Sequence, residues 1–117
     1  MAKVKITSDK LSLNEWGTLT FTAGTTDGFQ VPAVNGDWKR VVLVQNTDAS
    51  AAVTVTVKQG NGIQGVKDLD AFSVAAGKTA AIRLDDGRYK NVSGEDKDYI
   101  LIVPSSTKAS MSVIELP

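Results

Sequence analysis

Apolar and polar residues alternate one by one over several short stretches of the chain. The clearest is residues 51–58, in which three valines would lie on one face of a strand and two threonines and a lysine on the other. Residues 2–7 and 18–22 show the same period. Because a helix would spread these apolar residues around its circumference, the pattern predicts half-buried β-strands.

Other stretches are apolar on both faces. Residues 40–45 and 99–103 have this character and are predicted to be central strands, covered on both sides. Three more strands complete a set of about eight, at residues 71–74, 79–84 and 110–116. Short strands at this spacing favour an all-β fold, a single antiparallel β-sandwich that is Ig-like or jelly-roll-like. The strand order stays open, because Greek-key sandwiches, jelly rolls and partly open barrels share the pattern.

Turns and loops separate the predicted strands. Residues 46–50 and 75–78 carry the Asn, Asp, Ser and Gly typical of tight turns. The longest irregular stretches are residues 23–37 and 60–69, and such loops often carry binding function in compact β domains. No segment is rich enough in Pro, Gly or Ser to be a linker, so we expect one domain over residues 1–117.

Composition and charge narrow the choice of partner. The chain has 117 residues and a formal net charge of +0, from thirteen basic and thirteen acidic residues. A neutral domain has no overall field that would attract nucleic acid or an anionic membrane. We see neither an apolar signal-peptide core nor a run long enough to span a bilayer. We therefore expect no nucleic-acid or membrane partner.

The absence of cysteine and histidine bears on chemistry. Without cysteine there are no disulfides, no thiolate nucleophiles and no soft-metal sites, which fits folding in a reducing compartment. Without histidine, the commonest general base and the commonest zinc ligand are missing. The sequence therefore predicts that the protein is not an enzyme and holds no cofactor.

Two glycine motifs resemble nucleotide-binding signatures. Residues 60–65 match G-x-G-x-x-G, but no amphipathic helix follows to face a pyrophosphate. Residues 77–79 read Gly-Lys-Thr, but Phe72 stands where a P-loop needs a glycine. We interpret the first as a loop leaving a strand and the second as a hairpin turn.

Acidic residues gather in two places, residues 68–70 and 85–98. Oxygen ligands suit Ca²⁺ or Mg²⁺, yet the spacing of a calcium-binding loop is not met and these sequences are ordinary turn material. No pair of carboxylates is evidently placed in one apolar cleft for glycoside hydrolysis. We expect no metal site.

Aromatic residues are few, and their positions suggest contacts. Phe21, Phe72 and Tyr99 fall in predicted strands and are expected in the core or on a sheet surface. Trp16 and Trp38 lie in or beside predicted loops, where a tryptophan can anchor an interface or cap an open end of the sandwich. The candidate contact residues at the protein interface are Trp16, Phe29, Val31 and Trp38. Residues 2–7 are a candidate edge strand that could extend a neighbour's sheet.

Five segments carry a resemblance to a known family: residues 42–47 (VLVQNT), 53–55 (VTV), 60–65 (GNGIQG), 74–79 (VAAGKT) and 112–116 (SVIEL). Together they resemble the small β-sandwich decoration proteins, also called cement or head auxiliary proteins, of tailed bacteriophages. The resemblance covers about two thirds of the chain, and its motifs are strands and turns, shared with other structural virion proteins.

The resemblance implies a structural virion protein that binds the outer surface of the capsid and stabilises it. Its partner would be the major capsid protein, with a homo-oligomer, favoured as a trimer, at local symmetry axes. It would be made in the host cytoplasm and end on the capsid exterior of the virion. The family offers no active-site residues to transfer. The alternative function is a carbohydrate- or receptor-binding β-sandwich module of a phage fibre or adhesin.

Overall fold

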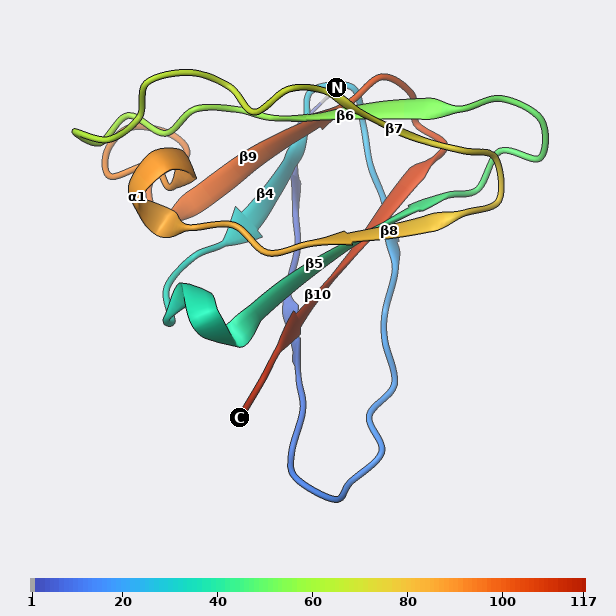
Figure 1. The fold of residues 1–117 in the computed structure, drawn as a ribbon, viewed down its shortest axis with the longest axis horizontal. Coiled ribbons are helices and arrows are strands. Elements are labelled where there is room, and N and C mark those ends of the chain that lie inside the picture. The colour runs from blue at the N-terminus through green and yellow to red at the C-terminus, as the bar shows by residue number, and fades with distance from the viewer. Residues whose placement is uncertain (1) are drawn as a thin grey trace.

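The computed structural model describes residues 2–117 and folds them into two β-sheets (Figure 1). The first sheet contains, in spatial order, β1 (Val4–Lys5), β4 (Phe29–Pro32), β9 (Tyr99–Pro104), β6 (Val53–Val57) and β7 (Phe72–Val74). The second contains β2 (Ser8–Lys10), β10 (Ala109–Glu115), β5 (Arg40–Asn46) and β8 (Thr79–Ile82), with β3 (Thr22–Ala23) also paired to β10. Two single-turn helices complete the fold, η1 (Asp37–Lys39) and α1 (Asp86–Tyr89).

The predicted all-β sandwich is confirmed, with one difference in strand direction. Most neighbouring strands are antiparallel, but β1 runs parallel to β4 and β2 runs parallel to β10, so both sheets are mixed. The difference arises at the N-terminus, where the single strand predicted over residues 2–7 is replaced by two short strands. β1 joins the edge of the first sheet and β2 the edge of the second.

Strand β6 shows how the alternation specifies the fold. Val53, Val55 and Val57 are buried between the sheets, whereas Thr54 is exposed. Burying a valine side chain is worth roughly 1.5–3 kcal/mol, so one strand of this pattern contributes substantially to stability. A shift of register by one residue would expose all three valines, which fixes the pairing of β6 with β9.

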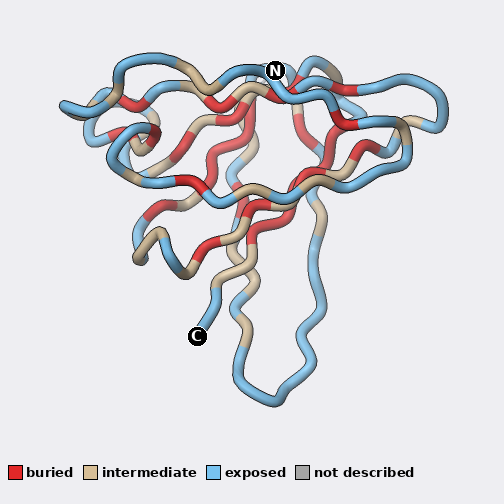
Figure 2. Tube along the Cα trace, in the orientation of Figure 1, coloured by how far each residue is buried: buried red, intermediate tan, exposed pale blue. Residues whose placement is uncertain are grey.

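The buried apolar side chains form one continuous cluster between the sheets, seen as the buried stretches in Figure 2. Phe29, Ile100, Ile102 and Met111 are the largest of the fully buried side chains. They come from β4, β9 and β10, and β4 lies far from the other two strands in the sequence. Long-range strand pairing therefore builds the core.

The two longest apolar stretches form central strands, as predicted. β5 lies between β10 and β8, and β9 lies between β4 and β6. Each buries only one face fully, however, because Val41, Leu43, Leu101 and Val103 are half-buried on the other. The second face of each strand is only partly covered, so the prediction that both faces are covered is wrong for that face.

Asn46 joins the two sheets at the end of β5. Its side-chain amide donates to the carbonyl oxygens of Ala51 and Val74, both at 2.9 Å, and Val74 belongs to β7 of the opposite sheet. The side-chain oxygen of Asn46 accepts from the backbone N–H of Asp48. A buried amide needs such partners to offset its lost hydration, and Asn46 is 1% exposed.

Charged residues hold the N-terminal edge of the first sheet. The Lys3 ammonium lies 2.9 Å from a carboxylate oxygen of Glu95 and 3.0 Å from one of Asp96. Hydrogen bonds to Glu95 and Asp96 raise the pKa of Lys3 above its usual value. Asp96 also accepts from the side chain of Gln30 in β4, so this network connects the N-terminal segment to the strand beside β1.

Candidate functional site

The most prominent surface feature is a loop that leaves the second sheet and returns to it, residues 11–21, called the arm below. It begins after β2 and ends at β3, and it projects well away from both sheets (Figure 1). At its base, the backbone N–H of Leu11 donates to the carbonyl of Glu115, and that of Thr20 donates to the carboxylate of Asp9. The arm is therefore fixed at its base and extends outward into solvent.

Three large apolar side chains of the arm are in water. The exposed fractions of Leu13, Trp16 and Leu19 are 78%, 104% and 40%. Single exposed apolar residues are common, but three on one projecting loop form a concentrated apolar surface that contributes little to the core of this fold. Such a surface is suited to burial against another molecule, with tryptophan as the strongest anchor.

Part of the arm has the sequence of a strand without a strand partner. Residues 18–22 alternate as a strand should, yet the structure pairs only Thr22 with Met111 and Ala23 with Ser110. Residues 18–21 belong to no strand of the part that the structure describes. The prediction of a strand there is wrong for this fold, because the arm diverges from β10 before it can extend the ladder.

The four predicted contact residues divide into two pairs. Trp16 and Trp38 are exposed, the latter to 65%, and both are accessible to a partner. Phe29 and Val31 are wrong as contact residues, because both are 0% exposed in β4, which lies between β1 and β9 in the first sheet. They stabilise the core instead.

The misplacement of Phe29 and Val31 has a clear cause. Residues 23–37 contain glycines, a proline and polar residues, so the sequence indicates a loop, whereas the structure places the four-residue strand β4 within it. In β4, Phe29, Gln30 and Val31 are all buried, and the amide of Gln30 bonds Asp96. A strand buried on both faces shows no alternation, and this one is too short to reveal itself by an apolar run.

Trp38 lies in η1, directly before β5. Its backbone carbonyl accepts a 2.7 Å hydrogen bond from the guanidinium of Arg83, just beyond β8. Together with Asp37, Leu84 and Asp85, these residues line a hollow of about 360 Å³. This surface is built from other parts of the sequence than the arm. It lies at β5 and β8, whereas the arm follows β2 at the other edge of the second sheet.

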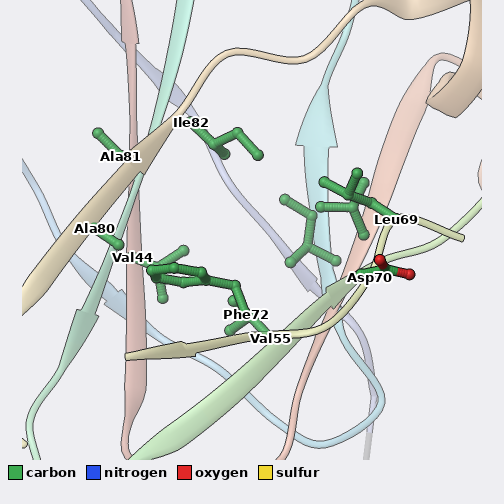
Figure 3. A pocket seen from close by; sticks show the side chains of 10 residues that line it. Val44, Val55, Leu69, Asp70, Phe72, Ala80, Ala81 and Ile82 are labelled. Atoms are coloured by element: carbon green, nitrogen blue, oxygen red, sulfur yellow. The ribbon is translucent and has the colours of Figure 1, made fainter. Parts of the chain in front are cut away.

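A second recess, of about 310 Å³, lies between the edge strands β7 and β8. Figure 3 shows its side chains, among them the Phe72 ring and Leu69. Phe72 is 58% exposed, so it is a sheet-edge residue rather than a core residue. The lining holds one carboxylate, Asp70, among apolar side chains, so the recess fits apolar contact and not paired-carboxylate chemistry.

The G-x-G-x-x-G sequence serves local packing. A Cβ on Gly60 would lie 2.3 Å from the carbonyl oxygen of Lys90, and one on Gly65 would lie 1.9 Å from that of Gly60. The side chain of Asn61 donates to the Ser93 carbonyl and accepts from the Val92 N–H, and these hydrogen bonds hold the loop in place. The glycines allow backbone segments to touch, and the loop interpretation is confirmed.

The Gly-Lys-Thr sequence forms a turn between the sheets. Gly77 has a φ of 71°, and the N–H of Lys78 donates to the carbonyl of Ala75. The turn connects β7 of the first sheet to β8 of the second, so it is not a hairpin within one sheet. Its positive φ explains the glycine.

The acidic clusters have structural partners. Asp68 accepts from the Lys58 ammonium and the Gln59 backbone, and these bonds lower the pKa of its carboxyl. Asp85 caps α1 by accepting from the backbone of Arg88. Within residues 2–117, no group of three or more Asp or Glu side chains is arranged to hold a metal ion.

Family models, curated proteins and solved structures give no match to this chain. None of the helices in the described part of the chain has the length and apolar character needed to cross a membrane.

Proposed function

We propose that the chain is a structural virion protein that docks on the outer surface of a phage capsid and stabilises it, through the arm. The observation that carries this proposal is the projecting loop with Leu13, Trp16 and Leu19 in solvent. A rigid sandwich that presents an apolar loop fits a binding role rather than catalysis. The partner proposed from the sequence resemblance is the major capsid protein.

The size of the arm favours a repeating partner. A tryptophan buries about 150–250 Å² on docking. A stable pairwise interface buries about 800 Å² on each side. One arm alone therefore gives a weak contact, which becomes strong when linked copies engage neighbouring positions of a lattice. This argument supports the proposed homo-oligomer, a trimer, on the capsid exterior.

Binding to capsids tests the proposal directly. Heads of the encoding phage, purified without this protein, are mixed with the purified chain and sedimented. We expect the wild-type chain to sediment with the heads and the Leu13→Ser/Trp16→Ser double variant to remain in the supernatant. The double variant should melt at the wild-type temperature, because neither side chain contributes to the core.

A matched control distinguishes the arm from apolar surface in general. Ile63 is 103% exposed on another loop, so Ile63→Ser removes similar apolar area at a different place. This variant should sediment with heads as the wild type does. Equal sedimentation of the double variant and the wild type would refute docking through the arm.

The carbohydrate- or receptor-binding role remains a second candidate because of Trp38. Exposed aromatic rings beside polar side chains are suited to sugar recognition, and Trp38 has that setting.

A further inference from the structure

The indole of Trp38 is held against the backbone on one face. A Cβ on Gly36 would lie 2.4 Å from each of two atoms of the six-membered ring, so the ring packs directly on the glycine. The side chain is nevertheless 65% exposed. One ring face is therefore fixed on Gly36 and the rest of the indole is presented to solvent, as a preorganised apolar platform.

Polar groups of both kinds surround this platform. The hollow of about 360 Å³ is lined by Asp37, Arg83 and Asp85 in addition to Trp38 and Leu84. The hollow is shallow and open to solvent, so a ligand would lie on Trp38 rather than inside an enclosed pocket. Two carboxylates supply acceptors and one guanidinium supplies donors.

Each polar group is oriented by a bond to the backbone. The guanidinium of Arg83 donates to the Trp38 carbonyl at 2.7 Å. One oxygen of Asp37 accepts from the Asp86 N–H at 3.1 Å, and one oxygen of Asp85 accepts from the Arg88 N–H at 2.8 Å. These bonds leave the other oxygen of Asp37 and the other guanidinium nitrogens of Arg83 for a ligand. The second oxygen of Asp85 lies 3.9 Å from the Arg88 guanidinium, a solvent-exposed ion pair.

Buried residues support the base of the hollow. Leu84 is 6% exposed, and its carbonyl accepts from the guanidinium of Arg40, which is itself 5% exposed. Arg40 also pairs with Asp86 of α1. The strands and the two helical turns are thereby held together beneath Trp38, which keeps the platform and its polar rim in place.

We propose that this hollow is a binding site for a neutral saccharide, with one sugar ring stacked on Trp38 and its hydroxyl groups bonded to Asp37, Arg83 and Asp85. A sugar ring offers an apolar C–H face to the indole. Its hydroxyl groups both donate and accept, which matches the mixed rim. The two carboxylates outnumber the one guanidinium, so an anion is disfavoured and a cation is the competing class of ligand. The site is an addition to the docking role of the arm and does not depend on it.

The test uses the two tryptophans as separate reporters. The chain has only Trp16 and Trp38, so an ¹⁵N-labelled sample gives two indole N–H signals, assigned with Trp16→Phe and Trp38→Phe. The probes are neutral trisaccharides of glucose, galactose, mannose and N-acetylglucosamine, added up to about 50 mM because a single shallow site has a Kd near the millimolar range. We expect at least one trisaccharide to shift the Trp38 signal saturably while the Trp16 signal stays unchanged.

Variants of the rim and platform sharpen this test. Trp38→Ala should abolish the saccharide-induced shifts of neighbouring backbone amides. Gly36→Ala should weaken binding by tilting the ring. Asp37→Asn and Asp85→Asn should each weaken binding about tenfold, the effect of losing one charge-assisted hydrogen bond. Ile63→Ala, on a distant exposed loop, should bind as the wild type does.

Three results would overturn the assignment. The first is that no trisaccharide moves the Trp38 signal. The second is that N-acetyl-lysine methylamide moves it and no sugar does, which would mark a cation site. The third is that sugar binding persists in Trp38→Ala. Capsid sedimentation of the same Trp38→Ala variant should be normal, so failure of this site and failure of the proposed docking role are distinguishable.

Discussion

The sandwich and the arm use similar apolar residues in opposite ways. In the sandwich, Phe29, Ile102 and Met111 are almost fully enclosed, and each is positioned by strand pairing. In the arm, Leu13 and Trp16 remain in solvent beyond a base held by a few hydrogen bonds. The difference teaches that residue type alone does not locate the core, since the arm's apolar residues add little to the stability of this fold.

The largest expected effect is on the sandwich. Phe29→Ala removes a fully buried ring from β4 and leaves a cavity between the sheets, so we expect the free energy of unfolding to fall by about 3–5 kcal/mol. Urea denaturation measures the change. The matched control is Phe72→Ala, the same substitution at a 58% exposed edge position, which should cost much less. Equal losses would show that the apolar recess at β7 is as well packed as the core.

Next in size is the buried amide that joins the sheets. Asn46→Ala leaves the carbonyls of Ala51 and Val74 without their donor, so stability should fall by about 1–3 kcal/mol. Asn61→Ala is the control, because the side chain of Asn61 makes two bonds to the backbone on an exposed loop, whereas that of Asn46 makes three in a buried position. Thermal unfolding of the two variants compares them. A smaller loss for Asn46 than for Asn61 would contradict the role assigned to burial.

A smaller effect concerns pH and a tight loop of the sandwich. Asp48 accepts from the backbone N–H groups of Ser50 and Ala51, and these bonds lower the pKa of its carboxyl below the usual 3.8. A lowered folded-state pKa contributes stability that is present above pH 3.8 and is lost as the pH falls through the folded-state value. The stability difference between wild type and Asp48→Asn should therefore narrow on acidification. Urea titrations at neutral pH and near pH 3 give the comparison, and a pH-independent difference would contradict it.

The smallest expected effect is on the arm. Trp16→Ala should change the free energy of unfolding by less than about 0.5 kcal/mol, because the side chain is fully exposed. Urea denaturation provides the measurement. A loss comparable to that of Phe29→Ala would mean that the arm packs on the sandwich in solution, and the contrast between the two regions would fail.

The sequence predicts the parts of this fold that depend on local alternation. β5, β6, β9 and β10 were recognisable because each repeats apolar residues at strand spacing. β4 was not, because Gln30 is buried between two apolar neighbours and the flanking residues are typical of loops. Strand order and the parallel pairing of β1 with β4 and of β2 with β10 depend on contacts between distant segments, which no local pattern encodes.

The candidate sites also divide into features that the local sequence predicts and features that depend on distant residues. Trp16 and Trp38 were identifiable as aromatic residues near loops, and their exposure agrees with that position. The packing of the Trp38 ring on Gly36 and the hydrogen bond from Arg83 to the Trp38 carbonyl were not predictable, because Arg83 lies far from Trp38 in the sequence. The sequence also did not predict that the arm diverges from β10, because residues 18–22 have the composition of a paired strand.

The position of β10 has a consequence for how the protein folds. β10 pairs with β2, β3 and β5, so residues 109–115 hold together strands from the first half of the chain. The second sheet cannot close on a ribosome until this last strand has emerged, and its pairing with β2 spans nearly the whole chain. Such long-range closure predicts slow folding for a domain of this size. Nascent chains that stop before residue 109 should remain sensitive to protease, and chains in which residues 109–115 have emerged should become resistant in a single late step.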